Sequence, residues 1–346
     1  MAYVFLNGYS PFSSGNELAG LLSRSIREIK IPAGVTVIGE SAFEGCSSLS
    51  RAVFCGDEKR LGGYSFASTA IDTIILPDSV SEIGDGAFYD CKLLKECTFG
   101  RELRLIGERV FEGSYCDIYD FSSCKYIPEL KSDLSFSGIR EGAVIFVPEE
   151  LFEEWKNSDG WTSVANKILP VAKRIELPDH GGASEGLDIR GNTLYGKGSC
   201  TDSIIVLPES CQYIEWGFLQ NDKTVDMLVL SPKGTWLGGD MGADSSLRIL
   251  KNYYGSAVSF GLYSTSSLKV ITVLDGINVD YYDFFINGAR DIVYDFSEAT
   301  TVPILGDTWY INTDGNARIL VPMRLYKEWV ESTNWLYLRD YIFPVK

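Results

Sequence analysis

The chain has 346 residues, of which 45% are hydrophobic and 23% are charged, and its formal net charge at pH 7 is −16. This length and apolar content are sufficient for two domains with buried cores. The strong acidity makes nucleic acid and anionic membrane surfaces poor partners. No apolar run approaches the roughly 18 residues that a membrane-spanning helix needs, so we expect no membrane span.

The N-terminal residues are expected to cap the fold. Residues 1–25 precede the first repeat, and residues 16–22 could form a short helix that covers its open end. The first ten residues lack a basic region followed by a long apolar core, so we expect no secretory signal. The compartment therefore stays unknown: a cell-surface location requires a trimmed signal, and the other options are a virion-associated or a cytoplasmic protein.

Residues 26–142 carry a repeat with a period of 22–23 residues. An aromatic ladder consists of Phe43, Phe66, Phe88 and Phe111. An aliphatic ladder, in which each residue is followed by glycine, consists of Ile38, Leu61, Ile83 and Ile106. A strand ladder consists of Ile31, Phe54, Leu76, Phe99 and Phe121, and proline follows two of its members at Pro32 and Pro77. A ladder of small residues consists of Cys46, Thr69, Cys91 and Ser114.

A fixed period of this length is typical of leucine-rich repeat solenoids. One turn of about 23 residues cannot bury its own apolar face, whereas turns stacked at the strand spacing of about 4.8 Å build one continuous core. The glycine after each aliphatic residue suits a tight bend, either because φ is positive or because a neighbouring turn approaches closely. The prolines end strands, since proline has no N–H to donate to a ladder.

The two best copies, at residues 31–49 and 76–94, read Ile/Leu-Pro-x-x-Val-x-x-Ile-Gly-x-x-Ala-Phe-x-x-Cys-x-x-Leu. In this pattern the chain resembles the BspA-like leucine-rich repeat family. The resemblance implies a solenoid fold and, because members of the family are mostly binding or adhesion proteins with varied targets, a role in recognition.

The repeats are followed by a predicted cap. Residues 144–147 read as a final strand, and residues 148–170 as a helical cap that begins with proline and acidic residues, which suits the start of a helix. Trp155 and Trp161 are expected to pack against the last turn. End caps are needed because an open turn would expose the core and the strand edges.

The same plan is repeated at an offset of about 175 residues. Residues 321–329 mirror residues 147–155, and Trp335 mirrors Trp161. We therefore predict two tandem solenoids, residues 1–173 and residues 174–346, each with its own cap and joined by a loop around residues 173–186. The second is more degenerate, with strands expected over 205–208, 228–230, 247–250 and 270–273. The expected fold is a β-rich solenoid with short parallel strands and helical caps, duplicated in tandem.

The eight cysteines predict no disulfide framework and no zinc site. Cys46 and Cys91 lie on the small-residue ladder, where threonine and serine take the same place, so they are expected to be buried free thiols. They would lie two turns apart, about 9–10 Å, which is too far for a disulfide. Cysteine pairs separated by two residues, which zinc sites often use, are absent from the sequence.

We expect no catalysis, no metal and no cofactor. His180 is the only histidine and lies in the glycine-rich loop, so it reads as a solvated loop residue rather than a catalytic base. The acidic pairs at 149–150 and 153–154 match the paired carboxylates of glycosidases only in composition, since a helix start favours acidic residues anyway. Residues 275–280 have a calcium-like spacing, but the glycine is misplaced for an EF-hand loop.

The second half carries a surplus of aromatic residues. In tyrosine doublets on a strand one ring points to each face, so one ring of each pair is expected to face outward. Exposed tyrosine and tryptophan are frequent in protein and carbohydrate binding surfaces, although degenerate repeats could also use them as bulky filler. The candidate ligand-binding residues are Tyr253, Tyr254, Tyr281, Tyr282, Trp309 and Tyr310.

The predicted function is a non-catalytic recognition or adhesion module that binds a protein or a glycan on a sheet face of the solenoid, mainly in the second half. The alternative is a structural, virion-associated protein such as a phage tail adhesin or decoration protein, which would fit the free thiols and the absence of a visible signal.

Overall fold

The computed structural model describes residues 24–233, 235–237, 245–252, 259–263, 266–273, 283–287, 290–304, 311 and 313–346. The chain divides into two compact units, Met1–Val171 and Ala172–Lys346. The helix predicted over residues 16–22 lies outside the described residues. The prediction that residues 1–173 and 174–346 are duplicated domains stays a prediction.

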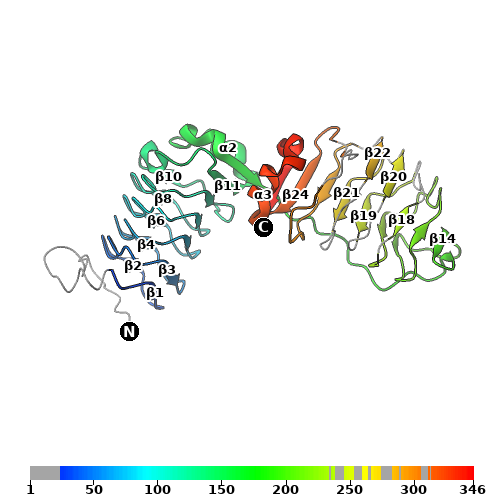
Figure 1. Cartoon of the computed structure of the whole chain (residues 1–346), viewed down its shortest axis with the longest axis horizontal. Helices are drawn as coiled ribbons and strands as arrows, with labels where there is room; N and C mark the ends of the chain where they lie inside the picture. The colour runs from blue at the N-terminus through cyan, green and yellow to red at the C-terminus, as the bar shows by residue number, and fades with distance from the viewer. Residues whose placement is uncertain are drawn as a thin grey trace. The chain divides into compact units, whose positions relative to one another are not determined.

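The first unit is a solenoid in which each turn of chain contributes one strand to each of two parallel sheets (Figure 1). Its strands are β1 (Glu28–Ile31), β2 (Val37–Ile38), β3 (Arg51–Phe54), β4 (Arg60–Leu61), β5 (Thr73–Ile75), β6 (Glu82–Ile83), β7 (Glu96–Thr98), β8 (Leu105–Ile106), β9 (Ile118–Asp120), β10 (Glu129–Leu130), β11 (Val144–Pro148) and β12 (Ile168–Val171). The even-numbered strands β2 to β10 form the sheet β10-β8-β6-β4-β2. The odd-numbered strands and β12 form the sheet β12-β11-β9-β7-β5 and the pair β1-β3.

The predicted aromatic ladder is one interior column, as the leucine-rich repeat interpretation requires. The ring centroids of Phe43 and Phe66 lie 5.2 Å apart, those of Phe66 and Phe88 5.8 Å, and those of Phe88 and Phe111 5.7 Å, all in stacked geometry. The column continues to Phe136, whose ring stacks on Phe111 at 5.4 Å. Like side chains therefore lie directly above one another from turn to turn, and the fold class is confirmed.

The described cysteines are free, and all of them except Cys55 are buried. Burial raises the pKa of the Cys46 thiol to about 11 and raises the pKa of Cys91 and Cys97 as well. The prediction of buried free thiols at Cys46 and Cys91 is confirmed. Raised pKa values keep these thiols protonated at neutral pH, so they serve as small apolar side chains.

The cap of the first unit is helical, as predicted, and is built from several short pieces, while residues 168–170 at its end belong to β12. It consists of the 3₁₀ helices η1 (Asp133–Phe136), η2 (Glu149–Leu151) and η3 (Trp161–Lys167) and the α-helix α2 (Phe152–Lys156). The chain then returns to the sheet as β12, which pairs in parallel with β11. The expected packing of Trp155 and Trp161 is observed, since both are fully buried and contact the ring of Phe121.

The second unit contains a parallel sheet in the order β15-β17-β19-β21-β23-β24-β25. The strands of the whole unit are β13 (Asp188–Arg190), β14 (Thr193–Gly196), β15 (Ile204–Val206), β16 (Tyr213–Ile214), β17 (Met227–Val229), β18 (Trp236–Leu237), β19 (Ile249–Asn252), β20 (Ser259–Tyr263), β21 (Val270–Val273), β22 (Asp283–Asn287), β23 (Val293–Asp295), β24 (Arg318–Pro322) and β25 (Ile342–Val345). Its cap consists of η4 (Met323–Leu325), α3 (Tyr326–Glu331) and η5 (Thr333–Tyr341). The four strands predicted in this half correspond to β15, β17, β19 and β21: the bounds of β21 are as predicted, and those of the other three are shifted by one or two residues.

Candidate functional site

Two kinds of position form rows across the turns on the odd-numbered sheet of the first unit. The first is the residue immediately before each strand, where the backbone N–H of one turn donates to the carbonyl oxygen of the turn before it. Lys95 N donates to Asp72 O at 2.7 Å, and Asp117 N donates to Lys95 O at 2.9 Å. Because the backbone is held from both sides, the side chains at these positions point outward in a regular column.

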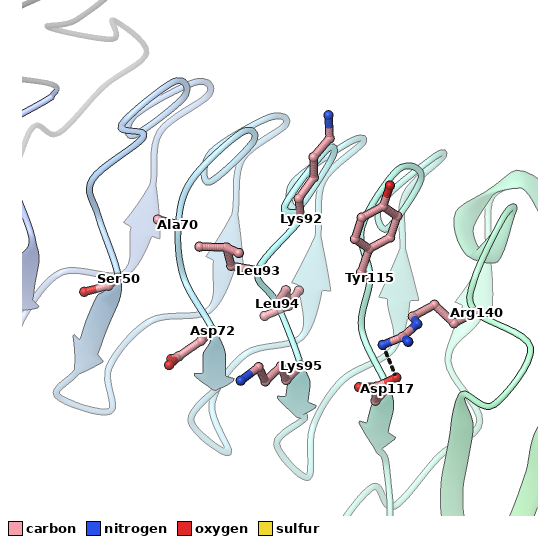
Figure 2. Close-up of a pocket in the computed structure, with 10 residues that line it drawn as sticks. All are labelled: Ser50, Ala70, Asp72, Lys92, Leu93, Leu94, Lys95, Tyr115, Asp117 and Arg140. Carbon is pink, nitrogen blue, oxygen red and sulfur yellow. Dashed lines mark hydrogen bonds and ion pairs between the residues drawn. The ribbon is translucent and has the colours of Figure 1, made fainter.

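This column borders a groove of about 630 Å³ that runs across successive turns (Figure 2). We refer to it as the pre-strand groove. It is lined by Ser50, Ala70, Asp72, Lys92, Leu93, Leu94, Lys95, Tyr115, Asp117 and Arg140. Leu94 is fully buried and belongs to the core, whereas Leu93 and Tyr115 are 57% and 52% exposed. The base of the groove is therefore formed in part by a core residue, and exposed apolar and aromatic side chains line it.

The charges in the pre-strand groove are mixed and only partly paired. Arg140 Nη1 donates to Asp117 Oδ1 at 2.9 Å, and Lys92 lies 3.3 Å from Asp90 outside the groove. Among the described residues, Asp72 and Lys95 form no ion pair or side-chain hydrogen bond. An exposed carboxylate and ammonium on adjacent turns, each without a partner, are available to an external group of opposite charge.

No group of three or more histidine, cysteine or acidic side chains that could hold a metal ion occurs in the described part of the chain. The acidic side chains at 150, 153 and 154 are exposed on the cap, and Glu149 is half-buried there. The calcium-like segment at 275–280 lies outside the described residues.

The sequence predicted that His180 is a solvated loop residue, but the structure places it in contact with a strand. It is half-buried, and its Nε2 lies 3.0 Å from the Nζ of Lys251 on β19. Its Nδ1 lies 3.2 Å from the carbonyl oxygen of Gly181. The sequence could not show this contact, because 71 residues separate the two side chains along the chain.

The predicted ligand-binding residues Tyr253, Tyr254, Tyr281, Tyr282, Trp309 and Tyr310 all lie outside the residues that the structure describes. The pre-strand groove was not predicted, although the sequence contains a signal for it. Ser50, Asp72, Lys95 and Asp117 recur at steps of 22 or 23 residues, directly before each strand. A polar residue at a fixed position of an otherwise apolar repeat marks the side of the solenoid that faces outward.

The stacked turns, the parallel sheets and the interior columns define a leucine-rich repeat solenoid. Residues 22–141 match the family described as BspA type Leucine rich repeat region, in six copies. Repeats of this kind are protein-interaction modules, and the fold is typically non-catalytic. None of the helices among the described residues is both long and apolar enough to cross a membrane.

Solved structures that are similar to the chain include bacterial leucine-rich repeat proteins. A leucine-rich repeat protein from Eubacterium ventriosum shares 17% identity with a TM-score of 0.35, over 84% of this chain and 70% of the other. The pneumococcal vaccine antigen PcpA shares 15% identity with a TM-score of 0.30, over 92% and 78%. A leucine rich cell surface protein from Faecalibacterium prausnitzii shares 17% identity with a TM-score of 0.26, over 82% and 79%. None of the curated proteins matches the chain.

Proposed function

We propose that this chain is a non-catalytic recognition module that binds a protein partner with the pre-strand groove of its first unit. The observation that carries the proposal is the groove itself, which presents Leu93, Tyr115 and the unpaired charges of Asp72 and Lys95 on adjacent turns. An aromatic side chain, an exposed aliphatic side chain and charges of both signs are the composition of a protein-binding surface.

A protein partner is favoured over a glycan by the charges. The groove carries three basic and two acidic side chains, although the whole chain has a net charge of −16. A neutral glycan would leave the charges of Asp72 and Lys95 without partners in the contact, and each buried unpaired charge weakens binding. A polypeptide can supply side chains of both signs.

The proposal also implies a mostly preformed surface. Ser50, Asp72, Lys95 and Asp117 project from backbone positions that are hydrogen-bonded to the neighbouring turn, so little backbone order has to be gained there on binding. The aromatic residues expected to bind in the second half stay a separate prediction, and so does an adhesive role at a cell surface. No described feature favours the virion-associated alternative, which stays an untested expectation.

The test is a parallel screen of the full chain against arrays of proteins and glycans. A double variant, Leu93→Ala with Tyr115→Ala, is expected to lose at least about tenfold in affinity for the protein ligands found, since truncation of a central interface side chain commonly costs more than about 1 kcal/mol. The matched control is Leu134→Ala with Tyr126→Ala, an exposed leucine and tyrosine of the same unit that do not line the groove. Equal binding by both double variants, or ligands found only among glycans, would contradict the proposal.

A further inference from the structure

The second kind of position on the sheet is the third residue of each strand, and here the two units differ. In the second unit these residues pair in register as Val206, Val229, Lys251, Thr272 and Asp295. In the first unit the corresponding positions, counted back from the cap, are Lys30 and Val53, which pair between β1 and β3, and Ile75, Thr98 and Asp120, which pair from β5 to β9. We call each set the outer row of its unit.

The correspondence of the two outer rows rests on shared local structure as well as on spacing. Asp120 and Asp295 each accept a hydrogen bond from the backbone N–H two residues later, at 2.9 Å in both units. A threonine precedes each of them in register, Thr98 in the first unit and Thr272 in the second. The neighbouring position is Ile75 in the first unit and Lys251 in the second.

A segment of the chain crosses the outer row of the second unit. Residues 172–184, which we call the crossing segment, begin at the β25 edge, where Ala172 N donates to Pro344 O at 2.9 Å. They end at the β15 edge, where Ser184 N donates to Val206 O at 2.8 Å and Val206 N donates to Ser184 Oγ at 3.1 Å. Figure 1 shows this part of the chain as a green trace that runs along the second unit.

The contacts of the crossing segment follow the order of the strands. Ile175 packs against the buried cluster that contains Leu320 of β24. Arg174 forms an ion pair with Glu298, which follows β23, and His180 contacts Lys251 of β19. Seven strands span about 29 Å at 4.8 Å per strand, and 12 residues reach at most about 40 Å, so the segment has to be largely extended.

Buried and exposed side chains alternate in part of the crossing segment. Ile175 and Leu177 are half-buried, while Glu176 between them and Pro178 after them are exposed. A hollow of about 550 Å³, which includes Lys251, Thr272 and Asp295 in its walls, remains beside residues 174–177. The sheet face therefore accepts a polypeptide laid across its strands, and over residues 175–178 every second side chain is turned toward the sheet.

The outer row of the first unit is more open. Ile75 is 64% exposed, whereas Lys251 at the corresponding position is half-buried. Val53 and Thr98 are half-buried, whereas Val229 and Thr272 are 1% and 2% exposed. Asp120 and Asp295 are both buried, at 3% and 7% exposed, so the face that is covered in the second unit is available in the first from Lys30 to Thr98.

We infer that the outer row of the first unit binds an extended segment of a partner polypeptide in the way that the second unit binds its own residues 172–184. Two differences between the rows define that partner. Where His180 meets Lys251, the partner needs an aliphatic side chain to cover Ile75. In the place of Ser184, which hydrogen-bonds the backbone of Val206, it needs a carboxylate to pair with the exposed side chain of Lys30.

The test uses two synthetic peptides and the full chain, with binding measured by fluorescence anisotropy. One peptide has the sequence of residues 172–184, and the other carries His180→Leu and Ser184→Glu. The substituted peptide is expected to bind about tenfold more tightly, because it places leucine on Ile75 and glutamate on Lys30. The native-sequence peptide does not displace the chain's own segment in the second unit, since a tethered segment has a high effective concentration.

A chain variant reverses the preference if the inference is right. Ile75→Lys recreates the second unit's residue at this position and should bind the native-sequence peptide at least as well as the substituted one. Leu134→Lys, which changes an exposed leucine outside the row, should leave the preference as it is. Circular dichroism checks that both variants are folded, which the exposure of Ile75 and Leu134 favours.

Three results would overturn the inference: no binding of either peptide at millimolar concentration, an unchanged preference in Ile75→Lys, or self-association of the chain that Ile75→Lys abolishes. The last result would assign the row to a second copy of the chain. The outcome is separate from that of the pre-strand groove, because Leu93→Ala with Tyr115→Ala leaves the outer row intact.

Discussion

At the recurring glycines Gly62, Gly84 and Gly107 of the repeat, the backbone of the preceding turn leaves no room for a Cβ atom. Gly62, Gly84 and Gly107 do not have positive φ angles, so conformational freedom is not the reason for glycine there. A Cβ on Gly84 would lie 2.6 Å from the backbone nitrogen of Gly63 in the preceding turn, and a Cβ on Gly62 would lie 2.6 Å from the nitrogen of Glu40. Of the two explanations that the sequence allowed, the close approach of neighbouring turns is the correct one.

Gly84→Ala is therefore expected to lower the free energy of unfolding by about 1–3 kcal/mol, the usual cost of overpacking a dense interior. The physical reason is that the obstructing atoms are backbone, which cannot move aside as a flexible side chain can. Urea denaturation of the full chain measures the change. The matched control is Gly142→Ala, where nothing lies within 4 Å of the added Cβ and φ is not positive. An equal effect of the two substitutions would contradict this account.

The two caps use the same pair of tryptophans in the same way. Trp161 Nε1 donates to Pro128 O at 2.8 Å, and Trp335 Nε1 donates to Pro303 O at 2.8 Å. The other tryptophan of each cap, Trp155 or Trp329, is fully buried, and its Nε1 has no hydrogen-bond partner. One indole thus fixes the cap to a carbonyl of the last turn, while the other fills volume.

This division predicts an order of stability among conservative variants. Trp161→Phe leaves the buried carbonyl of Pro128 without its donor and is expected to cost about 1–3 kcal/mol beyond the lost volume. Trp155→Phe removes an N–H that has no partner, so its cost should be smaller. Thermal unfolding followed by circular dichroism ranks the two variants. If Trp155→Phe were the more destabilising, the hydrogen bond to Pro128 would not be what holds the cap.

At the scale of the whole molecule, the first unit has a hydrophobic core of its own. A continuous buried cluster extends from Ile29 to Ile168 and contains residues of the first unit only. The aromatic column through Phe88 lies in the middle of this cluster. A solenoid core is stabilised by contacts between neighbouring turns, so damage to one turn weakens the turns on both sides of it.

Phe88→Ala is expected to lower the free energy of unfolding of the first unit by about 3–5 kcal/mol, since it removes a fully buried ring that stacks on two others. Hydrogen exchange measured by mass spectrometry reports on each unit separately. We expect faster exchange in residues 24–171 and little change in the second unit. The control is Leu134→Ala, a 47% exposed side chain, which should alter neither. Equal acceleration in both units would show that they unfold together.

Much of the fold was predictable because each copy of a repeat provides independent evidence for the same structure. Phe43, Phe66, Phe88 and Phe111 recur at one spacing, and only a stack of equivalent turns brings four such residues into one column. Phe136 was missed because the last step of the column is 25 residues long, which the cap imposes through η1. The sequence predicted a helical cap but not its division into short helices, since an acidic start and two tryptophans are compatible with one helix or with several.

The candidate binding surfaces were less predictable. The residues before the strands recur in the sequence, but their periodicity does not show that Leu93 and Tyr115 lie beside them in one groove. The loop composition of residues 173–186 correctly indicated a connection without regular structure. It could not indicate that the connection crosses the sheet of the second unit and brings His180 to Lys251.

The sequence by itself determined the stack, the repeat length and the identity of the interior columns, because these follow from periodic burial along the chain. Tertiary structure alone decided which outward face is covered and which is open. Whether a sheet face is covered depends on where a segment distant in sequence packs. A segment without a repeat has no periodic pattern from which its packing position could be predicted. The open outer row at Ile75 and the covered one at Lys251 are distinguished by that packing alone.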